Sequence, residues 1–210
     1  MPWEIRWFLK GMIPIELNNW FINLHGKEIE IENRLDYYFP KKKNDFVGVK
    51  LRGDDKKKLE CKWRFKQSDF SHSEKNLVGI LENWDKWSWK SDPTLVNAFT
   101  KFCDGANSVV KIEKKRKQLK FKIKSKKKIE PVDRIEDDER GGAIELTQLN
   151  AKNQDWWTLA VELVEKDCEK EQGLRDFLEK LLSKYSGPDL QKDDSYGYAK
   201  WAEIIQFSDD

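Results

Sequence analysis

Lysine, arginine and glutamate recur at every second position in several short segments of this 210-residue chain. Lys50 and Arg52 alternate with Val49 and Leu51, and charged residues alternate with apolar and aromatic ones across 58–65. Successive side chains of an extended strand point to opposite faces, so each such segment gathers its charges on one face. Lys and Arg bind phosphate oxygens, and carboxylates between them balance the charge or hold a divalent cation. The pattern therefore predicts a charged sheet face that is suited to a phosphorylated anion.

The charge of the whole chain is nearly balanced. Charged residues make up 37% of the sequence, yet the formal net charge is only +2, so an anion site must come from local segregation of charge. Near-neutrality also counts against nucleic acid as a partner. No apolar run approaches the roughly 20 residues of a membrane helix, and the first residues lack the features of a secretory signal. Three widely spaced Cys and two separate His form no disulfide or zinc pattern, so we expect a cytoplasmic protein with reduced cysteines.

The elements that must position the charged residues are mainly strands. Alternation predicts strands at 3–9, 27–40, 46–53, 58–65, 76–90, 142–149 and 156–165, and a hairpin over 108–124. Apolar spacing and capping residues predict helices at 14–25, 91–105, 171–185 and 196–207. The charged stretch 125–142 is expected to be a connection, part of it a strand edge. The length suggests a single domain over 1–210, with a C-terminal helical segment at about 168–210.

The charged face has two interpretations. In a plain two-layer domain one face of the sheet packs on helices and the other is solvated. In the second interpretation the sheet curves or closes into a barrel, so the charged face lines its interior. Basic residues recur on at least three strands with Glu between them, which favours the second interpretation. The expected class is thus α+β: an antiparallel β-barrel or strongly curved sheet of about eight strands, with a polar interior and packed helices.

The order of these segments resembles the CYTH superfamily, the triphosphate tunnel metalloenzymes. The matching residues are Asp36-Tyr37, Lys50-Leu51-Arg52 and Leu59-Glu60-Cys61-Lys62, followed by Glu145 and Glu162 in two late strands. The resemblance spans roughly residues 3–185 and looks like a bacterial branch of that superfamily. It departs at the first strand: the family pattern is Glu-x-Glu-x-Lys, whereas this chain has Glu4-Ile5-Arg6-Trp7-Phe8. Arg6 replaces a metal-binding carboxylate by a phosphate-binding group.

The resemblance implies a tunnel that binds a triphosphate or a related small phosphorylated anion. The phosphate-binding candidates are Arg6, Lys50, Arg52, Lys62 and Arg64. The candidates for binding Mg²⁺ or Mn²⁺, or for orienting the basic side chains, are Glu4, Glu60, Glu145 and Glu162. Two functions stay open: metal-dependent hydrolysis of the anion, and a non-catalytic binding or regulatory module that has lost the metal site. A third, nucleobase stacking on Trp84, Trp87 and Trp89, is less favoured than burial of these rings.

Overall fold

The computed structural model describes residues 2–26, 29–53, 58–90, 108–125, 128–136, 138–164 and 171–207. Its strands are β1 (Trp3–Lys10), β2 (Glu32–Tyr38), β3 (Val47–Arg52), β4 (Lys58–Ser71), β5 (Val78–Lys90), β6 (Val110–Ser125), β7 (Lys128–Val132), β8 (Gly141–Ala151) and β9 (Gln154–Val164). Its helices are α1 (Ile15–Asn23), the 3-10 turn η1 (Lys192–Asp194), α3 (Glu171–Leu181) and α4 (Tyr198–Phe207).

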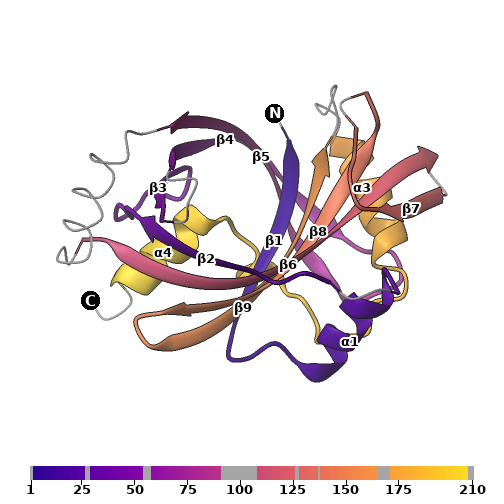
Figure 1. Ribbon diagram of the computed structural model, residues 1–210, viewed down its shortest axis with the longest axis horizontal. Coiled ribbons are helices and arrows are strands. Elements are labelled where there is room, and N and C mark those ends of the chain that lie inside the picture. Colours follow the sequence, from indigo (N-terminus) through magenta and orange to yellow (C-terminus); the bar gives the residue numbers. More distant parts are fainter. Residues whose placement is uncertain are drawn as a thin grey trace.

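The strands form one antiparallel sheet in the order β2-β3-β4-β5-β1-β9-β8-β6-β7. β2 also pairs with β6, with Glu32 opposite Arg116, and this pairing closes eight strands into a barrel. β7 pairs with the far end of β6 and lies outside the closed ring (Figure 1). The predicted α+β class with a closed antiparallel barrel is confirmed.

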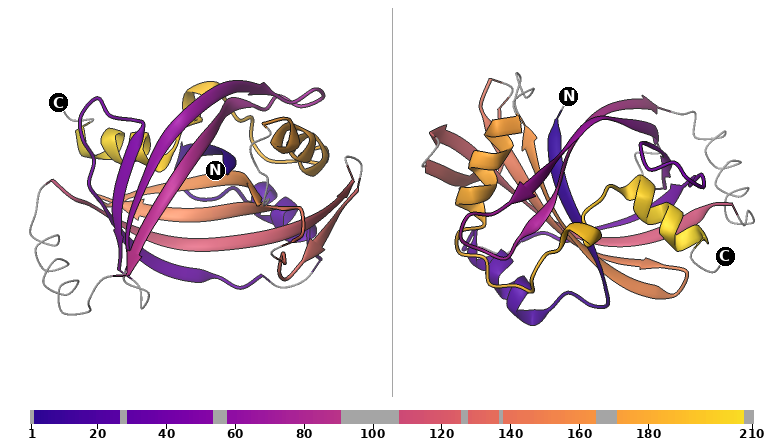
Figure 2. Two further views of the ribbon diagram at one scale, coloured as in Figure 1. Left: turned by 90° about the horizontal axis from the view of Figure 1, so that it is seen from above. Right: turned by 180° about the vertical axis from the view of Figure 1, so that it is seen from behind.

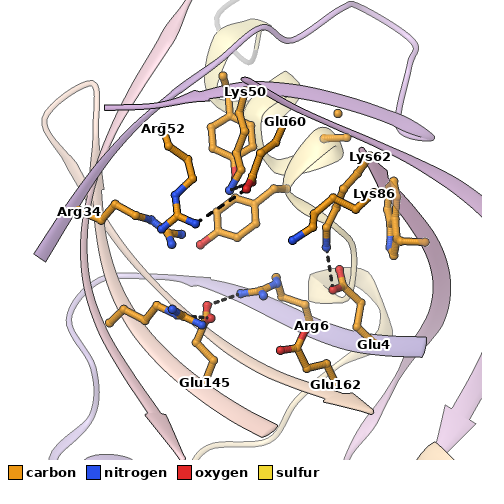
Figure 3. Close-up of a pocket in the computed structure, with 16 residues that line it drawn as sticks. Glu4, Arg6, Arg34, Lys50, Arg52, Glu60, Lys62, Lys86, Glu145 and Glu162 are labelled. Carbon is orange, nitrogen blue, oxygen red and sulfur yellow. Dashed lines mark hydrogen bonds and ion pairs between the residues drawn. The ribbon is translucent and has the colours of Figure 1, made fainter. Parts of the chain in front are cut away.

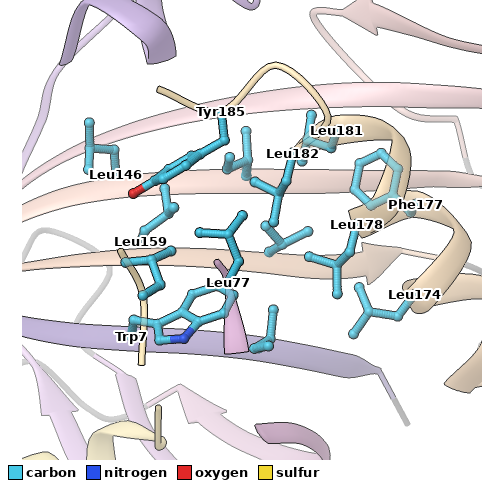
Figure 4. Close-up of a cluster of buried hydrophobic side chains, with 14 of the residues drawn as sticks. Trp7, Leu77, Leu146, Leu159, Leu174, Phe177, Leu178, Leu181, Leu182 and Tyr185 are labelled. Carbon is cyan, nitrogen blue, oxygen red and sulfur yellow. The ribbon is translucent and has the colours of Figure 1, made fainter. Parts of the chain in front are cut away.

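The outer face of one half of the barrel carries the main hydrophobic core. Trp3, Ile5 and Trp7 of β1 point outward and pack with alternate residues of β9, β8 and β6 against α1 and α3. Figure 4 shows Leu174, Phe177 and other α3 side chains seated on these strands. The spacing of apolar residues in α3 follows one helical stripe, and all its core residues are buried, as predicted.

The C-terminal helix packs at one end of the barrel, on inward-facing residues. Trp201 and Ile205 of α4 join Phe8, Trp156 and Ile112 in a second buried cluster, and all three strand residues lie on the inner faces of their strands. Trp201 stacks on Phe8 with ring centroids 5.1 Å apart. Figure 2 shows α4 and α3 at well-separated positions around the strands. The barrel is therefore covered on its outside by α1 and α3 and packed at one end by α4.

The structure corrects the prediction for residues 108–124 and completes the one for residues 125–142. The predicted hairpin over 108–124 is wrong, because these residues form the single long strand β6, which pairs with β2, β7 and β8. A strand this long can serve three neighbours, and the segment contains no glycine or proline to turn it. The stretch 125–142 does contain a strand, β7. The predicted helix over 91–105 lies outside the described residues.

Candidate functional site

A cavity of about 210 Å³ lies inside the barrel, and every one of the eight barrel strands and α4 contributes to its lining. Figure 3 shows charged side chains from opposite walls pointing toward one another across it. Among the described residues, seven cationic side chains and four carboxylates line the cavity: Arg6, Arg34, Lys50, Arg52, Lys62, Lys86 and Arg116, with Glu4, Glu60, Glu145 and Glu162. Its walls therefore carry more positive than negative charge.

Strand parity explains why the charges gather here. On β1 the odd positions Trp3, Ile5 and Trp7 face the helices outside, so Glu4 and Arg6 must face inward. The even positions of β3 and β4 obey the same rule. A polar interior in which these side chains find partners suits them, because burial of unpaired charge in apolar surroundings is costly.

One wall of the cavity is organised around Glu145. Arg6 Nη1 donates to Glu145 Oε1 at 3.0 Å, and Arg116 Nε donates to Glu145 Oε2 at 2.5 Å. Thr147 Oγ1 donates to the same carboxylate at 3.1 Å. Burial opposes ionisation of Glu145, but the two guanidinium groups outweigh it and hold its pKa well below the usual value. Glu145 is thus a charged anchor that orients two arginines.

The opposite wall repeats this arrangement with Glu60. Lys50 Nζ lies 3.0 Å from Glu60 Oε2, and Arg52 Nη1 lies 3.8 Å from Glu60 Oε1. Behind this wall Asp36 is fully buried, and its Oδ2 lies 3.4 Å from Lys50 Nζ and 2.8 Å from Lys114 Nζ. Burial lowers the pKa of both lysines to about 8, even though Asp36 favours their charged forms. Both lysines are therefore easier to deprotonate than an exposed lysine.

Glu4 and Glu162 face each other across β1 and β9 and differ in their partners. Lys62 Nζ donates to Glu4 Oε2 at 3.1 Å, and the pKa of Glu4 is lowered: burial acts against this, and Lys62 and Arg6 outweigh it. The pKa of Glu162 is raised by burial and by the neighbouring charge of Glu4. Within the described ranges Glu162 forms no direct hydrogen bond or ion pair with a cationic side chain. It is the carboxylate of this cavity with the strongest tendency to hold a proton.

The end of the cavity beneath α4 is lined by aromatic rings. The guanidinium carbon of Arg6 lies 4.8 Å from the centre of the Tyr198 ring, and Lys114 Nζ lies 3.7 Å from the same centre. Cations over an aromatic face are attracted by its quadrupole. The Tyr198 hydroxyl is buried and has no hydrogen-bond partner among the residues that the structure describes. It is a donor that a bound anion could use.

The structure brings together eight of the nine residues that the sequence singled out. Arg64 is the exception among them: its guanidinium binds Glu82 at 2.6 Å and Asp45 at 2.9 Å, and it does not line the cavity. The sequence missed Arg34, Lys86, Arg116 and Tyr198. Arg34 and Lys86 each lie two residues from another cavity-facing residue or inward carboxylate of the same strand, so strand alternation could have identified them. Arg116 stands in a run of cations on both faces of β6, so parity alone could not select it.

The predicted metal ligands do not make a metal site by their geometry. In the described part of the chain, no three His, Cys, Asp or Glu side chains come together in a way that could hold a metal ion. Instead, Glu4, Glu60 and Glu145 each form an ion pair with a Lys or Arg side chain. The residues present therefore do not fit Mg²⁺ or Mn²⁺.

The tryptophans of β5 divide between the two faces of the sheet. Trp84 lines the cavity and is buried, as predicted, with its indole N–H donating to Glu82 at 3.1 Å. The predicted burial is wrong for Trp87 and Trp89, which are 53% and 47% exposed. Their odd positions place them on the outer face of the barrel, where their ring centroids lie 6.1 Å apart.

Comparisons with known proteins give distant structural matches. No family model and no curated protein matches the sequence. Among solved structures, the PH1012 protein of Pyrococcus horikoshii OT3 is 14% identical, with a TM-score of 0.47 over 95% of this chain and 98% of that chain. A conserved hypothetical protein of Pyrococcus furiosus is 13% identical, with a TM-score of 0.40 over 95% and 99%. A structure from Bacillus halodurans described as a putative adenylate cyclase is 12% identical, with a TM-score of 0.46 over 91% and 95%. Matches at this level assign neither family nor function.

The helices of the described chain are all too short or too polar to cross a membrane.

Proposed function

We propose that the barrel binds a small phosphorylated anion of the triphosphate type inside its charged cavity. The observation that carries this proposal is the excess of cationic side chains over carboxylates in the cavity lining. Opposed cationic walls of this kind would repel each other without counter-charge, and the carboxylates compensate only part of them. An anion with several negative oxygens completes the balance, since Arg and Lys bind phosphate through charge-assisted hydrogen bonds.

The size of the cavity favours a compact ligand. Its volume of about 210 Å³ is below the range of roughly 300–1,000 Å³ that is usual for sites of drug-sized molecules. Cations line the walls from many directions, with Arg6 on one side and Lys50 and Arg52 on the other (Figure 3). A linear polyphosphate carries negative oxygens along its whole length and can contact cations on several walls at once, whereas a single monovalent anion cannot.

Titration calorimetry with inorganic tripolyphosphate tests the proposal. We expect saturable one-to-one binding, and weaker binding in the Arg52→Ala and Lys62→Ala variants. Loss of a hydrogen bond to a charged group costs about 1.5–3 kcal/mol, which corresponds to about a 10- to 150-fold loss of affinity. Circular dichroism spectra establish that each variant is folded.

Matched controls come from cations outside the cavity. Arg175 of α3 pairs with Glu171, and Lys124 of β6 pairs with Glu130, so neither touches the proposed ligand. Arg175→Ala and Lys124→Ala should bind tripolyphosphate as the unmodified protein does. Equal affinity in all four variants would show that the anion binds elsewhere, and the absence of any binding would refute the proposed function.

Hydrolysis of the bound anion is the second candidate, and Glu162 is the observation in its favour. A carboxylate with a raised pKa in a cavity is a candidate proton donor or acceptor. The test is release of inorganic phosphate from tripolyphosphate and ATP, with Mg²⁺, with Mn²⁺ and without metal. Turnover that is lost in Glu162→Gln would support the enzyme, and binding without turnover would identify a non-catalytic binding module.

A further inference from the structure

We infer that the cavity binds its phosphorylated anion directly through basic side chains, with no divalent cation between them, and that its carboxylates serve as internal counterions. This inference rests on the proposed function and adds the mode of binding to it. It stands on how the carboxylates of the described cavity are already partnered.

Three of these carboxylates already receive cations from the protein itself. Glu145 accepts from Arg6 and Arg116, Glu60 lies against Lys50, and Glu4 accepts from Lys62 (Figure 3). A metal ion could bind these oxygens only after displacing Lys or Arg. Arg6 and Lys62 would then lose the carboxylates that they bind. Lys50 and Arg116 would keep their second ion pairs, with Asp36 and Glu32. The side chain of Arg6 is 10% exposed, so solvent would compensate little for its lost partner, whereas Lys62 at 34% exposed would be partly compensated.

Arg6 neutralises the negative charge of the cavity carboxylates, as a bound metal ion would otherwise do. Its guanidinium bonds to Glu145 at 3.0 Å, and it interacts electrostatically with Glu4 along the same strand. Its donors point in several fixed directions, and unlike a metal ion it cannot exchange with solvent. Arg6 keeps its charge although it is buried, because the nearby Glu145 and Glu4 carboxylates raise its pKa.

The carboxylates have a second effect, which is to orient the cations before the anion arrives. A guanidinium matches a carboxylate and a phosphate with the same two-pronged geometry. Glu145 therefore holds Arg6 and Arg116 extended from the wall, and Glu60 does the same for Arg52 and Lys50. Such preorganisation reduces the side-chain entropy that is lost on binding.

Calorimetry of metal-stripped protein tests the inference. Tripolyphosphate is titrated into the protein in EDTA and, separately, in excess Mg²⁺. We expect tight binding in EDTA and weaker apparent binding in Mg²⁺, because Mg²⁺ binds phosphate oxygens in solution and competes with the cavity. Binding that occurs only with Mg²⁺ would overturn the inference and leave the proposed function intact. An absence of binding under both conditions would refute the proposed function itself.

Electron paramagnetic resonance with Mn²⁺ alone gives a second readout that needs no anion. We expect the signal of free Mn²⁺ to persist when the metal-stripped protein is added, and stoichiometric loss of that signal would overturn the inference. Arg6→Gln keeps a polar side chain but removes the charge, so it should lower tripolyphosphate affinity in EDTA at least tenfold. Arg175→Gln, outside the cavity, is its matched control, and equal affinity in the two variants would also contradict the inference.

Discussion

Replacement of Glu145 by Gln should destabilise the fold and tighten anion binding at the same time. The side chains of Glu145 and its partners Arg6 and Arg116 are 13%, 10% and 19% exposed. Removal of one partner from a buried ion pair costs about 3–5 kcal/mol. At about 2–4 °C per kcal/mol for a chain of this size, the melting temperature should fall by about 6–20 °C. The variant also removes the carboxylate that Arg6 binds, while Arg116 keeps its ion pair with Glu32 at 2.6 Å.

The gain in affinity follows from the same lost charge. At an assumed separation of about 7 Å, Glu145 repels a phosphate charge by about 2 kcal/mol at an effective dielectric constant of about 20. The amide oxygen of Gln can still accept from an arginine and retain part of its orientation, so loss of the negative charge should tighten tripolyphosphate binding by up to about 30-fold. The anion should also raise the melting temperature of the variant more than that of the unmodified protein, because ligand that binds the native state stabilises it by mass action.

Calorimetry and thermal unfolding measure the two effects, with Glu130→Gln as the control. Glu130 pairs with Lys124 at the exposed edge of β7, so its replacement should change neither the melting temperature nor the affinity. The stability difference between Glu145→Gln and the unmodified protein should shrink as the pH falls below 4.5, since the lowered pKa of Glu145 stabilises the fold only where the unfolded chain is ionised. A melting temperature equal to that of the control, or weaker anion binding, would refute the reasoning.

Three further predictions follow from the cavity and the two cores. Burial lowers the pKa of Lys50 to about 8, so tripolyphosphate affinity should fall between pH 7 and pH 9. Lys50→Arg stays charged over this range and should flatten the fall; an unchanged pH profile in this variant would show that Lys50 does not bind the anion. Leu178 is fully buried on the outer face of the barrel, so Leu178→Ala should lower the free energy of unfolding by about 2–5 kcal/mol, measured by thermal or denaturant unfolding. The folded variant should bind tripolyphosphate with unaltered affinity, and a large loss of affinity would show that the outer core shapes the cavity. Trp201→Ala in α4 should lower the free energy of unfolding by about 3–5 kcal/mol. It should also weaken tripolyphosphate binding, because Tyr198 on the same helix lines the cavity; unchanged affinity would count against a role for α4 in binding.

Much of the barrel wall is encoded in short stretches of sequence. Alternation places Lys50 and Arg52 on the face opposite Leu51, and the structure has them on opposite sides of the sheet. The apolar stripe of α3 likewise follows from its spacing, because helical periodicity decides which side is buried. These features are local, so neighbouring residues are enough to predict them.

Features that depend on pairing between distant segments were missed or mistaken. The hairpin prediction failed in β6, where cations occupy both parities and the inward position of Arg116 is decided by its register against Glu32 and Thr147. Arg64 has the parity of Lys62, yet Glu82 and Asp45 bind its guanidinium, near a register shift between β4 and β5. Arg64 pairs in register with Trp84, which lines the cavity, so what alternation could not predict is the pairing of its guanidinium with Glu82 and Asp45.

The sequence by itself determined that charges alternate with apolar residues on several strands, and that two amphipathic helices must cover an apolar face. Only the tertiary structure decided that β2 pairs with β6 and turns the charged face inward. It also decided which carboxylate meets which cation, as Glu145 meets Arg6 from a position 139 residues away. The physical reason is that strand parity is set by the backbone geometry of neighbouring residues, whereas register, closure and ion pairing are set by the energies of contacts between remote ones.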